Sequence, residues 1–331
     1  MKAVRVHQPG GVDALRLEEI PDPVPPPGWR TLEVKAAGVN HLDLWIRRGL
    51  ALAKYPVIPG ADAAGIERET GRRVLLNPAR SCGSCEFCAS GQKPMCRDYR
   101  IQGEHFDGTY AELLVAPAEN LIPIPDALSF EEAAAAPLAF LTAWRMLFTR
   151  GRLAPSEDVL IWSAGAGVGT VCVQFALRAG ARVIATASSP AKRERLRALG
   201  AQVVIDPSRE DVLARVRELT GKRGVDLVVD YIGKETWSRS LQCARRGGRI
   251  VTCGATSGHD PAEDLRQVFY RQLEILGCTM GNDKELADAL RLLFRGEVRP
   301  IVQDVLPLSE AREAQRRIES REVFGKIVLR P

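Results

Sequence analysis

Residues 159–170 read Val-Leu-Ile-Trp-Ser-Ala-Gly-Ala-Gly-Val-Gly-Thr, and this stretch decides the fold of the chain. A continuous apolar run ends in a turn of small residues, and a sequence with helical spacing follows over residues 168–179. This order predicts a buried strand, a tight turn and a helix. A helix that begins at such a turn presents free N–H groups, which favour a phosphate or another anion.

The sequence after this turn alternates between apolar runs and helical patterns up to about residue 280. Six near-continuous apolar strands with helices between them predict a doubly wound parallel sheet, so the fold class is α/β. The expected strands are residues 158–162, 182–186, 202–206, 225–231, 248–254 and 274–280, and the expected helices are 168–179, 191–199, 210–219, 236–244 and 263–270.

The rest of the chain is predicted to be mainly β. Short Val, Leu and Ile runs between turn residues indicate strands, with one short helix after Gly38-Val39-Asn40 and a capping box opened by Ser129 and Glu132. The strands are residues 2–6, 14–18, 31–37, 73–77 and 110–115, the helix is 41–48, and helices 285–294 and 309–319 with strand 326–329 complete the chain. We expect three segments, 1–122, 123–281 and 282–331.

The glycine turn predicts a nicotinamide dinucleotide cofactor. Gly165, Gly167 and Gly169, with Val168 between them, lie where such a fold needs a tight turn, close approach of the backbone to pyrophosphate and close packing of helix on strand. If Gly169 is the third glycine of the usual fingerprint, alanines fill the first two positions. The alternative is a tight turn with no ligand.

The end of the second strand favours NADP(H) over NAD(H). An NAD site commonly has Asp or Glu about 20 residues beyond the glycines, but residues 185–190 contain no acid. Ser188, Lys192 and Arg193 instead offer a hydroxyl and two cations, which suit a 2′-phosphate. The alternative is that Lys192 and Arg193 are ordinary surface residues of a helix.

Four cysteines within residues 82–96 predict a structural zinc lobe. Cys82, Cys85, Cys88 and Cys96 offer four thiolates, which fill the tetrahedral shell of one Zn²⁺ and leave no position for substrate. Two disulfides or four free thiols are the alternatives. The remaining cysteines lie among apolar residues and indicate a reducing compartment: Cys172, Cys243, Cys253 and Cys278.

Composition excludes several classes of function. The net charge of +5 is mild and dispersed, so we expect no nucleic-acid partner. The longest near-apolar run, residues 133–144, is too short to span a membrane, and residues 1–11 do not resemble a signal peptide. We therefore expect a soluble cytoplasmic protein.

Together these features resemble the medium-chain dehydrogenase/reductase superfamily over essentially the whole chain. The matching segments are Ala37-Gly38-Val39-Asn40, the cysteine lobe, Gly108-Thr109-Tyr110-Ala111-Glu112, Pro137-Leu138, Leu141-Thr142-Ala143-Trp144, the glycine turn and Phe324-Gly325-Lys326-Ile327-Val328. The resemblance implies a GroES-like catalytic domain formed by both chain ends and an inserted Rossmann domain. It also implies a homodimer or homotetramer joined through residues 274–280.

The chain departs from the zinc alcohol dehydrogenases of that superfamily at their catalytic metal. The resemblance places the three metal ligands at Asn40, Ala61 and Leu138, which cannot hold an ion together. With Asn40, the chain is similar to the quinone oxidoreductase and enoyl reductase branch, whose members reduce quinones or conjugated carbonyls with NADPH and no metal. Asn40 is the candidate donor to the reacting carbonyl; the alternative is a turn residue.

The remaining candidate site residues also come from the resemblance. His41, Thr142 and Gly254 are expected beside the cofactor, with His41 near its pyrophosphate. Asp62 and His105 are catalytic candidates, although Asp62 and Asp43 also fit structural roles and His105 also fits a solvent-exposed residue of a loop.

Three functions follow. The first is metal-independent, NADPH-dependent reduction of a small-molecule quinone or α,β-unsaturated carbonyl. The second is an alcohol or aldehyde dehydrogenase with an atypical zinc site drawn from His41, Asp62 and His105. The third is a non-catalytic NADPH-binding sensor.

Overall fold

The computed structural model describes residues 1–331, which form two compact units. The first unit contains residues 1–139 and 282–331, and the second contains residues 140–281. No helix is both long enough and apolar enough to cross a membrane.

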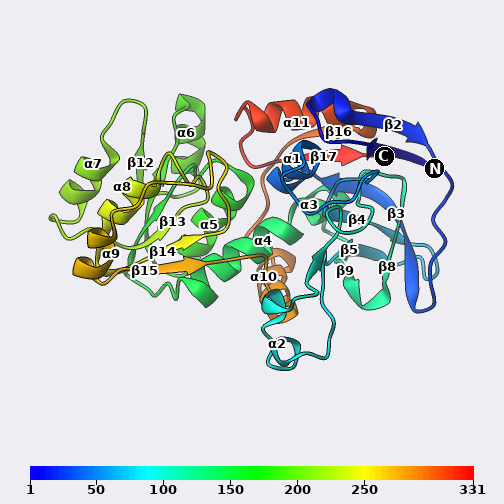
Figure 1. Cartoon of the computed structure of the whole chain (residues 1–331), viewed down its shortest axis with the longest axis horizontal. Coiled ribbons are helices and arrows are strands. Elements are labelled where there is room, and N and C mark those ends of the chain that lie inside the picture. The colour runs from blue at the N-terminus through cyan, green and yellow to red at the C-terminus, as the bar shows by residue number, and fades with distance from the viewer. The chain divides into compact units, whose positions relative to one another are not determined.

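The second unit is a six-stranded parallel sheet with helices around it (Figure 1). Its strands lie in the order β12-β11-β10-β13-β14-β15, as expected for a Rossmann fold. The strands are β10 (Asp158–Ile161), β11 (Arg182–Thr186), β12 (Val203–Ile205), β13 (Val225–Val229), β14 (Ala244–Thr252) and β15 (Glu274–Gly277). The helices are α5 (Gly167–Arg178), α6 (Pro190–Ala198), α7 (Val212–Leu219), α8 (Trp237–Cys243) and α9 (Leu265–Arg271). The predicted alternation of strands and helices is confirmed.

The central strands form because their side chains are apolar on both faces. All four residues of β10 and all five of β13 are buried, which is typical of a parallel sheet covered on both sides. Leu160, Val228 and Ile250 from three adjacent strands lie in one apolar cluster with residues of α7 and α8. This apolar core fixes the strands of the sheet relative to one another. The glycine turn follows the carboxyl end of β10.

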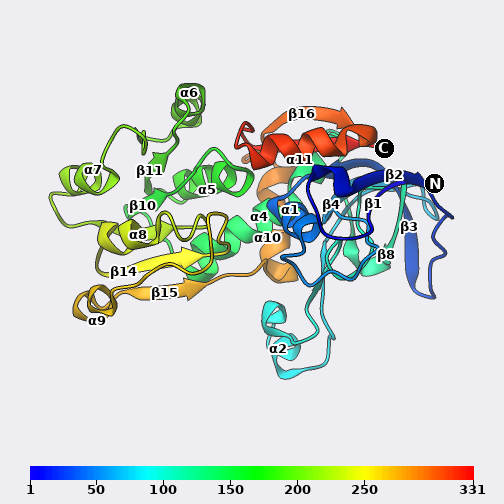
Figure 2. The ribbon, with the colours of Figure 1, turned by 45° about the horizontal axis from the view of Figure 1, so that its top comes forward.

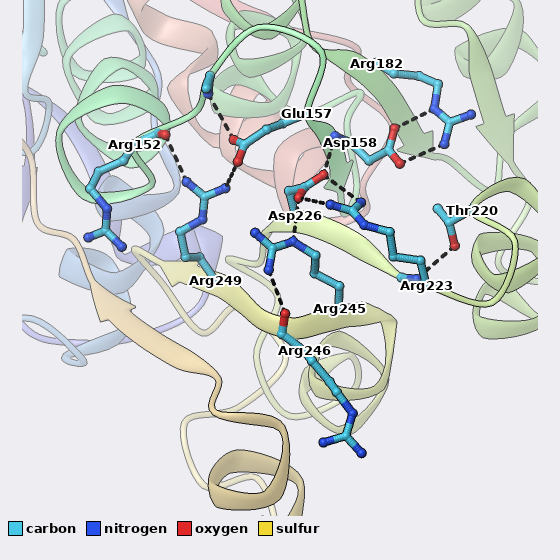
Figure 3. Close-up of polar contacts among 12 residues, drawn as sticks. Arg152, Glu157, Asp158, Arg182, Thr220, Arg223, Asp226, Arg245, Arg246 and Arg249 are labelled. Carbon is cyan, nitrogen blue, oxygen red and sulfur yellow. Dashed lines mark hydrogen bonds and ion pairs between the residues drawn. The ribbon is translucent and has the colours of Figure 1, made fainter.

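The opposite, amino-terminal edge of the same sheet carries a network of charged residues (Figure 3). Asp226 accepts hydrogen bonds from Arg223 and Arg245, both at 2.6 Å, and Asp158 faces Arg182 at 2.5 and 2.8 Å. Burial raises the pKa of Asp226, but the hydrogen bonds from Arg223 and Arg245 outweigh it and hold that pKa below the ordinary range. Because each arginine is paired at the edge away from the glycine turn, this network stabilises the sheet rather than forming a site.

The first unit is built on a seven-stranded sheet in the order β16-β17-β3-β4-β5-β9, with β8 also paired to β3. Its strands are β3 (Trp29–Gly38), β4 (Asp62–Glu67), β5 (Arg73–Leu76), β8 (Leu113–Pro117), β9 (Leu121–Pro123), β16 (Val302–Pro307) and β17 (Lys326–Arg330). The hairpin of β1 (Lys2–Val6) and β2 (Leu15–Glu19) lies beside it, and β6 (Ala79–Arg80) pairs with β7 (Arg100–Ile101). Its helices are α1 (His41–Arg48), α2 (Glu86–Ala89), α3 (Phe130–Ala135), α10 (Asp283–Phe294) and α11 (Ala311–Glu319), while α4 (Pro137–Trp144) begins in it.

The sequence did not predict β4 because its residues, Asp-Ala-Ala-Gly-Ile-Glu, are poor strand formers except for the isoleucine. The strand forms by pairing with β3 on one side and β5 on the other. Gly65 is required there, since a Cβ at this position would lie 1.9 Å from the carbonyl oxygen of Glu33.

The C-terminal segment returns to the first unit, and both chain ends lie close together in both views (Figures 1 and 2). Strand β17 pairs with β3, and α11 packs against α1. Arg47 of α1 is only 1% exposed and donates hydrogen bonds to Gln315 (3.0 Å) and Glu319 (2.9 Å) of α11. The final residues therefore help to build the N-terminal sheet.

The position of α3 explains where the two units divide. The capping box predicted at its start is present, with the Ser129 hydroxyl accepting from the Glu132 N–H at 3.1 Å. Because α3 packs on β3 and β4, it belongs to the first unit. The compact units therefore divide after Ala139 instead of at the expected boundary after residue 122.

Candidate functional site

The glycine turn connects the last residue of β10 to the first turn of α5. Ser163 enters the turn with a positive φ of 48° and donates its N–H to the hydroxyl of Thr186 at 2.9 Å. No side chain caps α5 at Ala166. The N–H groups of the first helical turn, at Gly167 and Val168, are therefore available to an anion such as a cofactor phosphate.

Gly169 allows the helix to approach the sheet closely. A Cβ at this position would lie 2.4 Å from the hydroxyl oxygen of Tyr231 and 2.8 Å from backbone atoms of Ala164. The Tyr231 hydroxyl donates to the carbonyl oxygen of Ser163 at 3.0 Å, and this hydrogen bond fixes the turn in place. This geometry fits the third glycine of a dinucleotide fingerprint, whose purpose is close helix-strand packing.

The other expected cofactor residues are spread over several elements. Ser188 is exposed after β11, Lys192 lies in the first turn of α6, and the half-buried Gly254 follows β14. Thr142 is 5% exposed in α4, and His41 is the exposed first residue of α1.

Arg193 has protein partners that the sequence did not reveal. Its guanidinium donates to the carboxylate of Asp206 at 2.6 Å and to the carbonyl oxygens of Ser188 and Ala187 at 2.5 and 3.3 Å. Asp206 follows β12, whose last residue pairs with the end of β11. The neighbouring strand therefore brings an acid to a segment that has none in its local sequence.

The four cysteines of the 82–96 lobe converge as a metal site requires. The sulfur of Cys82 lies 3.8 Å from that of Cys88 and 3.5 Å from that of Cys96, and the sulfurs of Cys85 and Cys88 are 3.6 Å apart. Four sulfurs about 2.3 Å from a tetrahedral Zn²⁺ would be about 3.8 Å from one another. No disulfide joins them. The donor set and its spacing fit one structural zinc ion.

The cysteine lobe is attached to the first unit at its base and at its tip. The base is the short β6-β7 pair, and α2 begins directly after Cys85 and contains Cys88. At the tip, Asn282 donates to the carbonyl oxygen of Gly91 at 2.8 Å, and Lys93 forms an ion pair with Asp283. With few apolar contacts of its own, such a loop depends on the metal for its shape.

Asn40 lies at the centre of a buried polar network in the first unit. It immediately precedes α1 and is 7% exposed. Its side-chain nitrogen donates to Asp62 Oδ2 at 2.9 Å, and its side-chain oxygen accepts from the ammonium group of Lys326. Lys326 Nζ also lies 3.4 Å from Asp62 Oδ2, and the N–H of Leu138 donates to Asp62 Oδ1 at 2.9 Å.

Burial shifts both charged partners toward their neutral forms. It raises the pKa of Asp62, against the opposing effect of Lys326 and the hydrogen bonds from Asn40 and Leu138. It lowers the pKa of Lys326, and the carboxylates of Asp62 and Asp43 oppose that shift. The two groups therefore stabilise each other's charged forms in a place that water does not reach.

Asp43 extends this network through the first turn of α1. Its Oδ2 accepts from the Asn40 N–H at 2.8 Å and from the Tyr110 hydroxyl at 2.9 Å, while its Oδ1 is buried without a partner. Burial raises the pKa of Asp43 to about 7, although both hydrogen bonds act in the opposite direction. Asp43 fixes the start of α1 and therefore the position of Asn40.

The structure does not bring His41, Asp62 and His105 together as metal ligands. His105 Nδ1 accepts from the Ile101 N–H at 3.1 Å and lies 3.7 Å from Glu104, within its own loop. Asp62 is bonded to Asn40 and Lys326 as described. The group of potential metal ligands that the structure does assemble is the four cysteines.

Sequence reasoning assigned no role to Lys326 and overlooked Asp206. A lysine at the start of the apolar run Lys-Ile-Val-Leu was the available signal for Lys326, since such a residue must be paired if the strand is buried. Asp206 had no comparable signal, because its proximity to Arg193 depends on the order of β11 and β12 in the sheet.

Comparison with known proteins agrees with the fold and the site. The zinc-binding dehydrogenase family model matches residues 167–295, and the alcohol dehydrogenase GroES-like domain model matches residues 26–126. An alcohol dehydrogenase of Geobacillus stearothermophilus is 32% identical over 100% of this chain and 99% of its own length. A 2-haloacrylate reductase of a Burkholderia species is 33% identical over 99% of this chain and 98% of its own length. A crystal structure described as an NAD-dependent alcohol dehydrogenase has a TM-score of 0.96 and 43% identity over the full length of both chains. The chain is therefore an oxidoreductase that belongs to the zinc-type medium-chain dehydrogenase/reductase superfamily.

Proposed function

We propose that this protein is an NADPH-dependent reductase of quinones or α,β-unsaturated carbonyl compounds, and that hydride transfer proceeds without a catalytic metal. The observation that carries the proposal is the Asn40–Asp62–Lys326 network. Where the superfamily resemblance places metal ligands, this chain has Asn40, Ala61 and Leu138.

These residues do not fit a catalytic zinc ion. Ala61 and Leu138 have no side-chain ligand atoms, and the Asn40 oxygen already accepts from Lys326. The Leu138 N–H and the Asn40 amide both point to Asp62. The ammonium group of Lys326 therefore supplies positive charge beside Asn40, and a metal ion would have to compete with it for the Asn40 oxygen.

Conjugate reduction suits such a site better than alcohol oxidation does. The cofactor, when bound, supplies the hydride, which adds to the carbon β to the carbonyl group. Electron density then moves onto the carbonyl oxygen, and a proton from solvent or a protein donor completes the saturated product. Hydrogen-bond donors are able to stabilise this enolate, whereas a zinc alcohol dehydrogenase uses its metal to acidify the hydroxyl group of the alcohol.

Asn40 is the proposed donor to that oxygen. Its side-chain nitrogen carries two hydrogens, of which one is bonded to Asp62 at 2.9 Å. The other has only a long contact of 3.4 Å with the carbonyl oxygen of Gly38, so a better acceptor would replace it. We assign no catalytic role to His105, whose ring nitrogen is bonded within its own loop.

The preference for NADP(H) rests on Ser188, Lys192 and Arg193. Arg193 is held beside the end of β11 by Asp206 and two carbonyl oxygens, which places its charge near the expected adenosine ribose. The relative of known structure at 43% identity is described as NAD-dependent. Asp206 is the acid that would serve an NAD(H) site in this chain, so the cofactor preference depends on the Arg193–Asp206 pair.

We also propose that the cysteine lobe binds one structural zinc ion and that the protein forms a homodimer or homotetramer. The second proposal is supported by β15, an edge strand with Ile275 40% exposed, beside α9, where Phe269 is 59% and Tyr270 66% exposed. A second copy of this chain would cover these residues. Analytical ultracentrifugation of the wild type should give a dimer or tetramer, and a monomer at micromolar concentration would contradict the proposal.

The runner-up is an alcohol dehydrogenase with an atypical zinc site, as many of the similar proteins are described as alcohol dehydrogenases. One set of measurements separates the two functions. We expect one zinc per chain, turnover of a quinone or enone with NADPH, little oxidation of a saturated alcohol, and no loss of activity on brief chelation. Two zincs per chain, with alcohol oxidation abolished by the chelator before the protein unfolds, would establish the runner-up instead. Cofactor binding without turnover of any carbonyl would favour the non-catalytic sensor.

A further inference from the structure

Lys326 is a buried cation with no role in the hydride and proton transfers of the proposed reaction. It is the first residue of β17 and is 4% exposed. Gly325 before it has φ of +83°, and a Cβ there would lie 2.2 Å from the carbonyl oxygen of Ile301. The Lys326 N–H donates to the same oxygen at 2.8 Å. The backbone therefore holds this lysine in one place, and its side chain points to Asn40 and Asp62.

The two ends of a side-chain amide have nearly the same shape but opposite hydrogen-bonding roles. The oxygen of Asn40 only accepts, and its nitrogen only donates. Lys326 has only donors and ionised Asp62 only acceptors, so together they allow one orientation of the amide. Its oxygen faces the ammonium group and its nitrogen faces the carboxylate.

We propose that Lys326 is a positioning residue for the reduction: its ammonium group fixes the orientation of the Asn40 amide and polarises it toward donation. This inference rests on the proposed function. The physical basis is that hydrogen bonds in a chain strengthen one another in a low-dielectric interior. The positive charge of Lys326 beside the amide oxygen withdraws electron density from the amide nitrogen. The second hydrogen of that nitrogen therefore becomes a stronger donor to a substrate oxygen.

The arrangement also explains why Asp62 is present. Without the carboxylate, Lys326 would be a buried charge bonded only to an amide oxygen, which is costly. Asp62 is 0% exposed and receives hydrogen bonds from Asn40 and Leu138 as well as the lysine. Asp62 therefore balances the charge that Lys326 brings to Asn40.

Four variants test the proposal by enone or quinone reduction with NADPH. We expect Lys326→Met to lower kcat about 10- to 100-fold, less than the loss of a direct oxyanion donor often costs, because Lys326 acts through Asn40. NADPH affinity should stay within about twofold of the wild type. Lys326→Arg should recover part of the lost kcat, since it retains the charge and the N–H donors. Lys35→Met is the matched control on β3, where Lys35 is half exposed and pairs with Glu33, and it should leave kcat unchanged.

The fourth variant separates positioning from stability. Lys326→Met alone leaves Asp62 buried without its cation and so should destabilise the fold. The double variant Asp62→Asn/Lys326→Met removes both charges and should restore thermal stability. If Lys326 positions Asn40, kcat of the double variant stays low. A double variant that regains both stability and wild-type kcat would show that Lys326 only balances Asp62, and this would overturn the proposal.

A measurement without turnover keeps this inference separate from the proposed function. In a ¹H–¹⁵N spectrum, the side-chain amide signals of Asn40, assigned from their loss in Asn40→Ala, should shift in Lys326→Met and remain in place in Lys35→Met. Unchanged Asn40 signals in Lys326→Met would refute the positioning role, whatever the enzyme reduces. Shifted signals in a protein that turns over no quinone or enone would support the positioning role and reject the proposed function.

Discussion

Replacing Asp206 with Asn should increase the preference for NADPH. Arg193 is bonded to the Asp206 carboxylate at 2.6 Å, and their side chains are 14% and 6% exposed. Solvent and salt therefore screen this pair only weakly. The 2′-phosphate of NADPH must compete with the Asp206 carboxylate for the Arg193 guanidinium. It must also approach the negative charge of that carboxylate. Asp206→Asn removes the competitor and the repulsion but keeps a side chain of nearly the same shape.

The size of the effect follows from the value of one charged hydrogen bond. A hydrogen bond to a charged group contributes about 1.5–3 kcal/mol, and about 1.4 kcal/mol corresponds to tenfold in affinity. We therefore expect the Kd of NADPH to fall about tenfold in Asp206→Asn, while that of NADH stays nearly constant. Lys192→Ala with Arg193→Ala should have the opposite effect, weakening NADPH by about tenfold or more and leaving NADH nearly unchanged.

Fluorescence titration of both cofactors against the three proteins is the assay. Thermal unfolding of each variant is the control, because Arg193 also bonds the carbonyl oxygens of Ala187 and Ser188. A loss of NADH affinity in Asp206→Asn, with no gain for NADPH, would refute the reasoning. It would identify Asp206 as the acid that binds the adenosine ribose of NAD(H).

Three further predictions concern the metal lobe, the buried network and the proposed donor. Cys88→Ser should lose zinc and unfold at a lower temperature, with residual activity following the folded fraction; loss of zinc at full thermal stability would contradict a structural role. Asp43 has a folded pKa of about 7 against an ordinary value of 3.8, so its folded form retains a proton that the unfolded chain releases. The free energy of unfolding of the wild type should therefore fall as pH rises from about 4 to about 7, and Asp43 should contribute on the order of 4 kcal/mol to that fall. Urea unfolding of Asp43→Asn should lack this contribution. An equal pH dependence in both proteins would rule out the raised pKa of Asp43. Asn40→Ala should lower kcat about 10²-fold with NADPH affinity intact, and steady-state kinetics showing unchanged kcat would exclude Asn40 as the donor.

Local sequence was sufficient for most elements because each carries its own pattern. The helix expected at residues 41–48 and the strand at 182–186 occur at those residues, and the capping box of Ser129 and Glu132 is present. The glycine turn was equally predictable from the sequence, since local steric limits require small residues there, as the close approach of Gly169 to Tyr231 shows. By contrast, β4 was missed because pairing with two neighbours, rather than propensity, makes it a strand.

The sequence by itself determined the fold class, the superfamily resemblance and the four cysteines of the cysteine lobe, because their signals lie within short segments. Only the tertiary structure decided the orientation of Asn40 and the partner of Arg193. Lys326 is 286 residues from Asn40 along the chain, and Asp206 reaches Arg193 through the pairing of two strands. A hydrogen bond or ion pair of this kind depends on which backbone segments the sheets bring together, and no periodicity or motif in the linear sequence records that distance.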